Sequence, residues 1–298
     1  MSKFFEAVNK MDPKLADPSL PVALSPVTNS SEVSRWEATA RAIEAKPAFP
    51  LSSEAPPVVR APTTEPHKHS DSTEGFPSLQ GLRDVRINLA AGSPALPFDG
   101  SDERAAERYR IIRTKLRQDL RRPRVLCISS SGIGDGKSVT ATNIAGALAL
   151  KRDTRVLLID ADLRRSTLAK MLGLPQGPGL SEVLAGVVEW QQAATRILDA
   201  PNLFFLPAGE SKAHPAELLD SPRWKATCDL FRNTFSFVIV DSPPMGTVAD
   251  YDLIQAPCDG IILVARQDHS NRSRLLKSIA SVSTERLIGV VMNCVSPW

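Results

Sequence analysis

The sequence predicts an α/β protein with a doubly wound, mostly parallel β-sheet that follows a Pro-rich N-terminal tail. Three observations predict this fold. Short, continuously apolar runs recur along the last two thirds of the chain, segments with helical periodicity separate them, and prolines gather in the first third. Continuously apolar runs indicate strands that are buried on both faces, and their alternation with helices indicates a parallel sheet.

The tail is predicted to cover residues 1–100. More than half of the 24 prolines fall there, together with many Ser, Thr, Ala and Glu residues and few aromatic ones. Such a composition buries too little apolar surface to offset the entropy lost on ordering, so we expect a mostly disordered segment. A short amphipathic helix over residues 1–11, with a frayed terminus as the alternative, and another helix over residues 34–46 would interrupt it.

The folded domain is predicted to cover residues 101–298 and to contain six strands, each a short apolar run bounded by turn residues. They cover residues 125–129, 156–159, 203–206, 237–240, 261–265 and 287–292. Helical periodicity between the runs predicts helices over residues 138–150, 216–231 and 271–283. Ligands of doubly wound sheets bind at the carboxyl ends of the strands, so we expect the functional site there.

The first motif follows the strand at residues 125–129 and reads SSSGIGDGKS over residues 129–138. It matches the P-loop pattern G-x-x-x-x-G-K-[ST] except at its first position, which is Ser131. Three glycines let the backbone curl so that its amides point at phosphate oxygens, and the next helix adds the positive end of its dipole. A Gly-rich turn before an ordinary helix is the alternative, but the position between a buried strand and an apolar helix favours a phosphate site.

We therefore predict that this loop binds ATP, with Lys137 reaching the β- and γ-phosphates and the Ser138 hydroxyl ligating Mg²⁺. Asn293, after the last strand, would contact adenine, with a turn cap as an equal alternative. The predicted ATP-binding residues are Gly132, Gly134, Asp135, Gly136, Lys137, Ser138, Val139 and Asn293.

Carboxylates end two further predicted strands. Asp160 and Asp162 follow the apolar run at 156–159, and Asp241 follows the run at 237–240. Carboxylates at the ends of buried strands are destabilising unless something compensates them, and a metal ion and an incoming hydroxyl proton would do so. A polar turn that Asp162 caps is the alternative. We predict a metal site of Ser138, Asp160, Asp162 and Asp241, and a catalytic group of Lys137, Asp160, Asp162 and Arg164.

Charge and composition argue against several partner classes. The net charge of +3 is too mild to indicate nucleic acid, and the basic run at residues 104–124 fits either a solvated helix face or a partner or membrane-surface patch. No apolar run reaches the roughly 18 residues that a membrane span needs, and the N-terminus lacks the apolar core of a secretory signal. The four cysteines form no C-x-x-C pair, so we expect reduced thiols in a cytoplasmic protein.

With these motifs in this order, the chain resembles the bacterial tyrosine kinases (BY-kinases), the CpsD/CapB-like kinases of capsule and exopolysaccharide synthesis. Asp160, Asp162 and Arg164 match the D-x-D-x-R motif of that family, and Asp241 and Pro244 match its D-x-x-P motif. The resemblance implies a deviant Walker P-loop fold similar to MinD and ParA. It also implies an ATP- and Mg²⁺-dependent protein-tyrosine kinase in which Asp160 or Asp162 orients or deprotonates the incoming hydroxyl.

An upstream segment resembles the E-x-x-R-x-x-R motif with which that family assembles rings. Its residues here are Glu107, Arg110 and Arg113, although a simple i,i+3 ion pair between Glu107 and Arg110 is the alternative. The resemblance implies a ring-like homo-oligomer. It also implies a membrane-anchored polysaccharide co-polymerase as the activating partner, which would hold the protein at the inner face of the membrane.

Two features depart from the family pattern. Ile133 stands where many members have proline, which is a minor change. The family autophosphorylates a Tyr-rich C-terminal tail, whereas the two tyrosines here, Tyr109 and Tyr251, lie inside the predicted fold. We therefore expect slow or absent self-phosphorylation. The alternative function is a ParA/MinD-like ATPase switch or scaffold, which Gly132 disfavours because that class carries a signature lysine at this position.

Overall fold

The computed structural model describes residues 79–210 and 214–294. The helices predicted over residues 1–11 and 34–46 lie outside the described residues, as does most of the predicted tail. Within the described residues, no helix combines the length and the apolar character needed to cross a bilayer.

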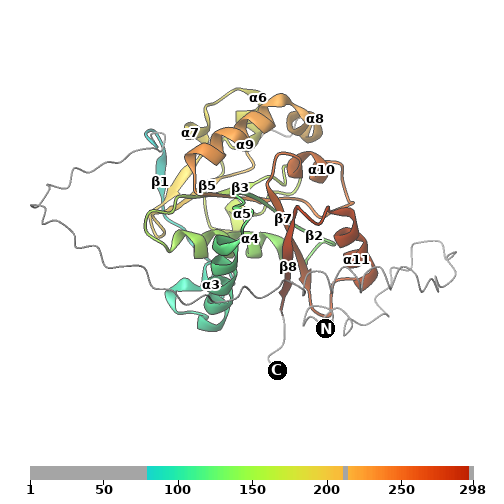
Figure 1. The fold of residues 1–298 in the computed structure, drawn as a ribbon. Helices are drawn as coiled ribbons and strands as arrows, with labels where there is room; N and C mark the ends of the chain where they lie inside the picture. The colour runs from blue at the N-terminus through green and yellow to red at the C-terminus, as the bar shows by residue number, and fades with distance from the viewer. Residues whose placement is uncertain (1–78, 211–213, 295–298) are drawn as a thin grey trace, which may run out of the picture. The chain divides into compact units, whose positions relative to one another are not determined.

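The described strands form one eight-stranded sheet in the order β1-β4-β5-β3-β6-β2-β7-β8 (Figure 1). The strands are β1 (Arg83–Val85), β2 (Val125–Ser130), β3 (Val156–Asp160), β4 (Thr195–Ile197), β5 (Leu203–Leu206), β6 (Phe237–Asp241), β7 (Gly260–Arg266) and β8 (Leu287–Asn293). Every pairing is parallel except that of β4 with β5. The prediction of a doubly wound, mostly parallel sheet is confirmed, and all six predicted strands are present.

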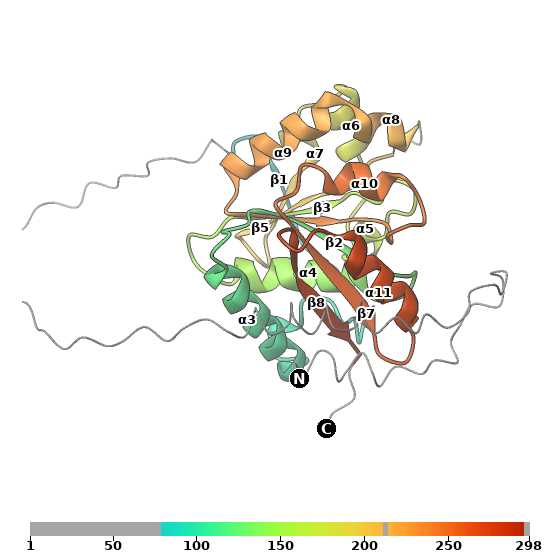
Figure 2. The same ribbon diagram turned by 45° about the vertical axis from the view of Figure 1, so that its right-hand side comes forward.

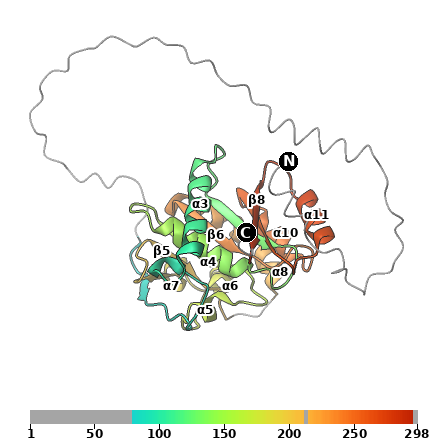
Figure 3. The same cartoon turned by 90° about the horizontal axis from the view of Figure 1, so that it is seen from below.

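Helices cover both faces of this sheet (Figures 1 and 2). One face carries the 3-10 helix η1 (Pro97–Asp99), α3 (Glu103–Gln118), α4 (Lys137–Ala149) and α5 (Leu168–Met171). The other carries α6 (Leu180–Ala185), α7 (Trp190–Ala193), α8 (Pro215–Asp220), α9 (Pro222–Thr234), α10 (Asp250–Gln255) and α11 (Arg272–Ser281). Figure 3 shows the face that α3 and α4 cover.

The side chains of the central strands alternate between two apolar clusters. In β3, Val156 and Leu158 join the cluster beneath α3 and α4, whereas Leu157 and Ile159 join the cluster on the opposite face. This alternation follows from the two-residue period of a strand, and it explains why the strands read as continuously apolar. The strand pairing places Asp160 opposite Asp241, and Asp241 opposite Ile128, two residues before the end of β2.

Three features of the fold differ from the sequence-based expectation. The described fold begins before residue 101, because β1 pairs with β4 and the Leu96 amide donates to Asn143 Oδ1 at 2.6 Å. The strands β1 and β4 were not predicted, since each has only three residues and no continuous apolar run. The single helix predicted over residues 216–231 is two helices, because Pro222 lacks the amide that a continuous helix would use.

Candidate functional site

The P-loop connects β2 to α4 at the carboxyl end of the sheet. Gly134 and Gly136 have φ angles of +85° and +87°, a region that favours glycine. A Cβ atom on Gly136 would lie 2.1 Å from the side-chain nitrogen of Asn293, so that position also lacks space for a side chain. Both glycines are therefore required by the shape of the loop.

Asp135 holds the P-loop in this shape from inside. Its side chain is buried, and its Oδ2 accepts hydrogen bonds from the Gly132 amide at 3.0 Å and the Ser131 hydroxyl at 3.5 Å. Its Oδ1 accepts a hydrogen bond from the Ser270 hydroxyl. Burial raises the pKa of Asp135, and the hydrogen bond from Ser270 opposes that rise. The carboxylate of Asp135 thus contacts the protein, and its predicted contact with ATP stays a prediction.

Two segments distant in the sequence support the same loop. His269 Nε2 lies 3.0 Å from the carbonyl oxygen of Ile133, and Asn293 Nδ2 donates to the carbonyl oxygen of Asp135 at 3.3 Å. Asn293 therefore contacts the P-loop backbone, and its predicted contact with adenine stays a prediction. Sequence reasoning missed His269 and Ser270, because no local motif marks the turn that follows β7.

The loop after β6 is joined to the base of the P-loop. The Ser129 hydroxyl donates to the Pro243 carbonyl at 2.8 Å, and the Ser242 hydroxyl donates to the Ile128 carbonyl at 3.0 Å. The Met245 amide donates to the Ser130 carbonyl at 2.9 Å. These bonds hold the end of β6, with Asp241, beside the phosphate loop.

Asp160 and Asp241 end the adjacent strands β3 and β6 and lie opposite each other in register. Each is only 1% exposed. Among the described residues, both oxygens of Asp241 and Oδ1 of Asp160 lack a hydrogen-bond partner, although Asp160 Oδ2 accepts from the amides of Thr167 and Leu168. Burial raises the pKa of both carboxyls, and the charge of Asp241 raises that of Asp160 further. Buried oxygens without partners fit a hard divalent cation such as Mg²⁺.

The described residues contain no cluster of three or more acidic, His or Cys side chains suited to a metal ion. A Mg²⁺ site at a P-loop does not need one, because one or two carboxylates, a hydroxyl, phosphate oxygens and water complete its shell. Asp241 and Ser138 of the predicted metal set suit that arrangement. The roles predicted for Asp160 and Asp162 as metal ligands stay predictions.

Lys137 begins α4 and lies near the carboxylates. Its Nζ lies 3.9 Å from Asp162 Oδ2 and 3.5 Å from the Ser138 hydroxyl. Asp162 also accepts a hydrogen bond from the Arg165 amide at 3.0 Å, so it orders its own turn as the polar-turn alternative supposed. Cation, hydroxyl and carboxylate are thus brought together at the carboxyl end of the sheet.

Arg164 lies in the same turn but is held by Asp250 at the start of α10. Its Nε and Nη2 donate to the two oxygens of the Asp250 carboxylate at 2.7 and 3.0 Å. Bidentate pairs of this kind are strong and directional. The role predicted for Arg164 in neutralising phosphate charge therefore stays a prediction, and it requires this guanidinium to exchange partners.

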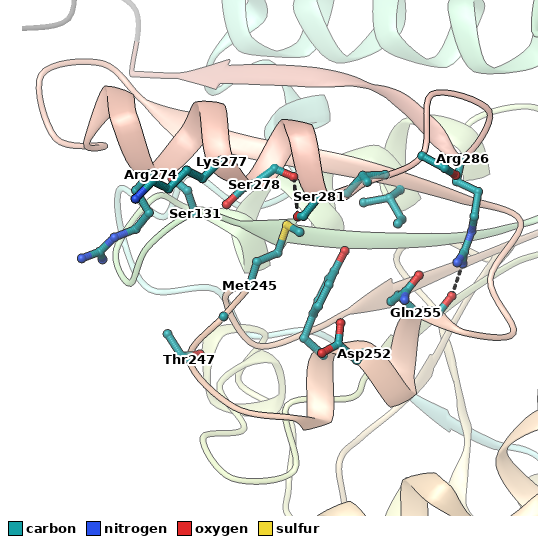
Figure 4. A pocket seen from close by; sticks show the side chains of 15 residues that line it. Ser131, Met245, Thr247, Asp252, Gln255, Arg274, Lys277, Ser278, Ser281 and Arg286 are labelled. Carbon is teal, nitrogen blue, oxygen red and sulfur yellow. Dashed lines mark hydrogen bonds between the residues drawn. The ribbon is translucent and has the colours of Figure 1, made fainter. Parts of the chain in front are cut away.

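A groove of about 780 Å³ opens beside the P-loop, between α10 and α11 (Figure 4). Ser131 of the P-loop lines it near Arg274 and Lys277 of α11, and Met245 lines it as well. Tyr251 also lines it; its side chain is 4% exposed, and its hydroxyl has no hydrogen-bond partner among the described residues. The groove provides a polar, partly cationic approach to the site.

The predicted assembly residues lie on α3 and make contacts within the chain. Arg110 pairs with Glu103 and, at 3.2 Å, with Glu107. Arg113 donates to the carbonyl oxygen of Ala147 near the end of α4 at 3.3 Å. The i,i+3 ion pair is therefore present, and the predicted role of these residues in ring assembly stays a prediction.

Taken together, the P-loop, the strand-end carboxylates and the parallel sheet define a P-loop nucleotide-binding protein. Residues 126–298 match the family model of the CobQ/CobB/MinD/ParA nucleotide binding domain. The tyrosine-protein kinase CpsD of Streptococcus agalactiae serotype Ia is 30% identical over 199 residues, which are 65% of this chain and 84% of that relative. The tyrosine-protein kinase YwqD of Bacillus subtilis is 33% identical over 192 residues, covering 63% of this chain and 80% of that one.

A longer relative and a solved structure agree with these matches. The tyrosine-protein kinase ptk of Acinetobacter johnsonii is 36% identical over 190 residues, but the match covers only 26% of its length. The kinase domain of the Escherichia coli tyrosine kinase ETK superposes with a TM-score of 0.61 at 26% identity, covering 68% of this chain and 82% of that one. The chain therefore belongs to the bacterial tyrosine-protein kinase family.

Proposed function

We propose that this chain transfers the γ-phosphoryl group of ATP to tyrosine residues and so regulates exopolysaccharide or capsule synthesis. The observation that carries the proposal is the pair of buried carboxylates, Asp160 and Asp241, whose unpartnered oxygens lie at the end of the sheet beside a fully formed P-loop. A structural role alone leaves such groups without compensation. A bound Mg²⁺ ion would supply that compensation and would also offset the charge of the ATP phosphates.

In the proposed reaction, amides of residues 132–138 and the Lys137 ammonium bind the ATP phosphates. Ser138 and Asp241 hold Mg²⁺, which neutralises phosphate charge when bound. Asp160 or Asp162 orients the tyrosine hydroxyl and takes its proton. The tyrosine oxygen forms a bond to the γ-phosphorus as the bond to the ADP oxygen breaks, which yields ADP and phosphotyrosine.

The acceptor tyrosine is proposed to lie on a partner protein. Tyr109 is 9% exposed on α3, and Tyr251 is 4% exposed on α10. A tyrosine packed in a helix cannot bring its hydroxyl in line with a γ-phosphate without local unfolding. We propose a membrane-anchored polysaccharide co-polymerase as the partner, which would place the kinase at the inner, cytoplasmic face of the membrane. Self-association of the kinase through α3 into a ring belongs to the same proposal.

The test is incubation of the full chain with γ-labelled ATP and Mg²⁺, followed by phosphosite mapping. The incubation is done with the kinase alone and with the cytosolic segment of the proposed membrane-anchored co-polymerase. Asp160→Asn and Asp162→Asn are compared with Asp220→Asn, which removes an exposed carboxylate on α8. We expect phosphotyrosine mainly on the partner, and its loss in one of the first two variants but not in the third. Release of inorganic phosphate without phosphotyrosine on either protein would favour the ATPase switch instead.

A further inference from the structure

Helix α3 carries a cationic stripe on the side that faces away from the sheet. Arg104, Arg108, Ile111 and Lys115 follow one another at spacings of three and four residues, and all four are exposed. Ala106, Tyr109 and Leu116 of the same helix are buried, and the helix packs on α4 and η1 (Figure 2). Residues at such spacings share one helix face, so the stripe lies opposite the packed face.

The segment that contains the stripe is far more basic than the rest of the chain. Residues 104–124 hold nine Lys and Arg residues against two Asp and Glu residues, a net charge of +7. The whole chain has a net charge of +3, which leaves −4 for all other residues. Positive charge is therefore concentrated in one short segment, as expected for a surface that meets a polyanion.

Four of the nine cations in this segment already make ion pairs or hydrogen bonds within the protein. Ion pairs or hydrogen bonds to carbonyl oxygens hold the side chains of Arg110, Arg113, Arg121 and Arg124. Five other cations of the segment make no side-chain hydrogen bond or ion pair within the described part of the chain. They are Arg104, Arg108, Lys115, Arg117 and Arg122.

Two large apolar side chains are exposed among these cations. Leu120, just after α3, is 90% exposed, and Ile111 within the stripe is 49% exposed. Apolar side chains interleaved with unpaired cations are typical of helices that lie in the interface of an anionic bilayer, where the cations meet headgroups and the apolar groups reach the acyl boundary.

We propose that the stripe of Arg104, Arg108, Ile111 and Lys115, together with the exposed Leu120 and Arg122 that follow α3, binds the surface of an anionic lipid bilayer. The exposed Ile111 and Leu120 favour lipid over nucleic acid. Binding to a phosphate backbone is electrostatic and does not bury apolar side chains, whereas a bilayer interface does. The face is also distinct from Glu107, Arg110 and Arg113, which are engaged in contacts within the chain. The contact is direct and does not depend on a membrane-anchored partner protein.

The test is co-sedimentation of the full chain, without nucleotide or partner, with vesicles of phosphatidylcholine alone and of phosphatidylcholine mixed with phosphatidylglycerol. We expect binding only to the anionic vesicles and release as salt is raised. The triple variant Arg104→Gln, Arg108→Gln and Lys115→Gln should weaken binding about a hundredfold, because each cation near such a surface contributes roughly a factor of five. Glutamine keeps the helix propensity, so circular dichroism should be unchanged.

The matched control removes three exposed cations from the opposite face of the sheet, as Arg223→Gln, Lys225→Gln and Lys277→Gln. This variant should bind like the parent. The proposal is overturned if the parent does not bind anionic vesicles, if both triple variants lose binding equally, or if duplex DNA of equal charge competes fully with the vesicles. A change in oligomer size caused only by the α3 variant, with vesicle binding retained, would assign the face to contacts between copies and would also overturn it.

Discussion

Two regions of this fold are equally buried but opposite in composition. Where α7 and α9 pack on β5, the rings of Trp190, Phe204, Phe231 and Phe235 lie with centroids 5.5 to 6.0 Å apart. At the carboxyl ends of β3 and β6, Asp160 and Asp241 are buried with unpartnered oxygens. The first region stabilises the fold without reference to any ligand. The second is costly to bury without a ligand, and we propose that a bound cation offsets that cost.

Removing an aromatic ring from the first region should have the largest effect on stability. Phe231 is fully buried and contacts both Trp190 and Phe235. Phe231→Ala should lower the free energy of unfolding by about 3 to 5 kcal/mol, measured by urea denaturation. Leu230→Ala, at a neighbouring exposed position, is the control and should cost well under 1 kcal/mol. Equal losses in both variants would remove the contrast between the two regions.

The next largest effect concerns the N-terminal border of the fold. A chain that starts at residue 79 should keep the melting temperature of the full chain. A chain that starts at residue 101 loses β1 and the contacts of Leu96 and Phe98 with α4, and should be about 2 to 4 kcal/mol less stable. Calorimetric melting of the three chains measures this. Equal stability of the chains from 79 and 101 would show that residues 79–100 contribute little to the core.

Removing the charge of a carboxylate in the second region should raise the free energy of unfolding instead of lowering it. Asp241→Asn removes a buried charge that Lys137 and Ser138 offset only in part, so the nucleotide- and Mg²⁺-free protein should gain roughly 1 to 3 kcal/mol at pH 7. Burial raises the pKa of Asp241 from 3.8 to about 6. The stabilising contribution of the protonated carboxyl is therefore full below pH 3.8 and is lost as the pH rises through 6. The gain should accordingly shrink toward pH 4, and Asp220→Asn should show no such dependence. A loss of stability in Asp241→Asn at pH 7 would contradict the account.

The smallest effect is expected at Tyr251, whose hydroxyl is buried without a hydrogen-bond partner among the described residues. Tyr251→Phe removes only that hydroxyl, so stability should stay within about 0.5 kcal/mol or rise slightly. Burial raises the pKa of Tyr251, which makes it a poor phosphoacceptor as well. The variant should therefore leave phosphotransfer to a partner unchanged. Loss of more than about 1 kcal/mol would show that the hydroxyl has a partner in solution.

The sequence predicted the central sheet because its signals are local. Each of the six strands is an apolar run several residues long, and the P-loop and the carboxylates directly follow three of them. The short strands β1 and β4 gave no such signal. β1 lies at the edge of the sheet and consists of Arg83, Asp84 and Val85, so its place depends on pairing with β4, which lies more than 100 residues away.

The sequence motifs point to candidate site residues but not to the contacts that hold those residues in place. Asp135 is adjacent to the predicted phosphate-binding glycines, yet the hydroxyl that orients it comes from Ser270, 135 residues later. Arg164 matches a motif, yet its partner Asp250 lies 86 residues away. Such contacts arise because parallel strands bring distant loops to one edge of the sheet, and no short pattern in the sequence records them.

We propose that the buried polar groups at the carboxyl end of the sheet form a Mg²⁺–ATP site. Titration calorimetry of the full chain with ATP and Mg²⁺ tests it most directly. We predict saturable binding that Lys137→Met weakens at least about a hundredfold, because charge-assisted phosphate contacts are lost. Lys151→Met, at an exposed position after α4, should bind like the parent. Unchanged affinity in Lys137→Met would contradict the account.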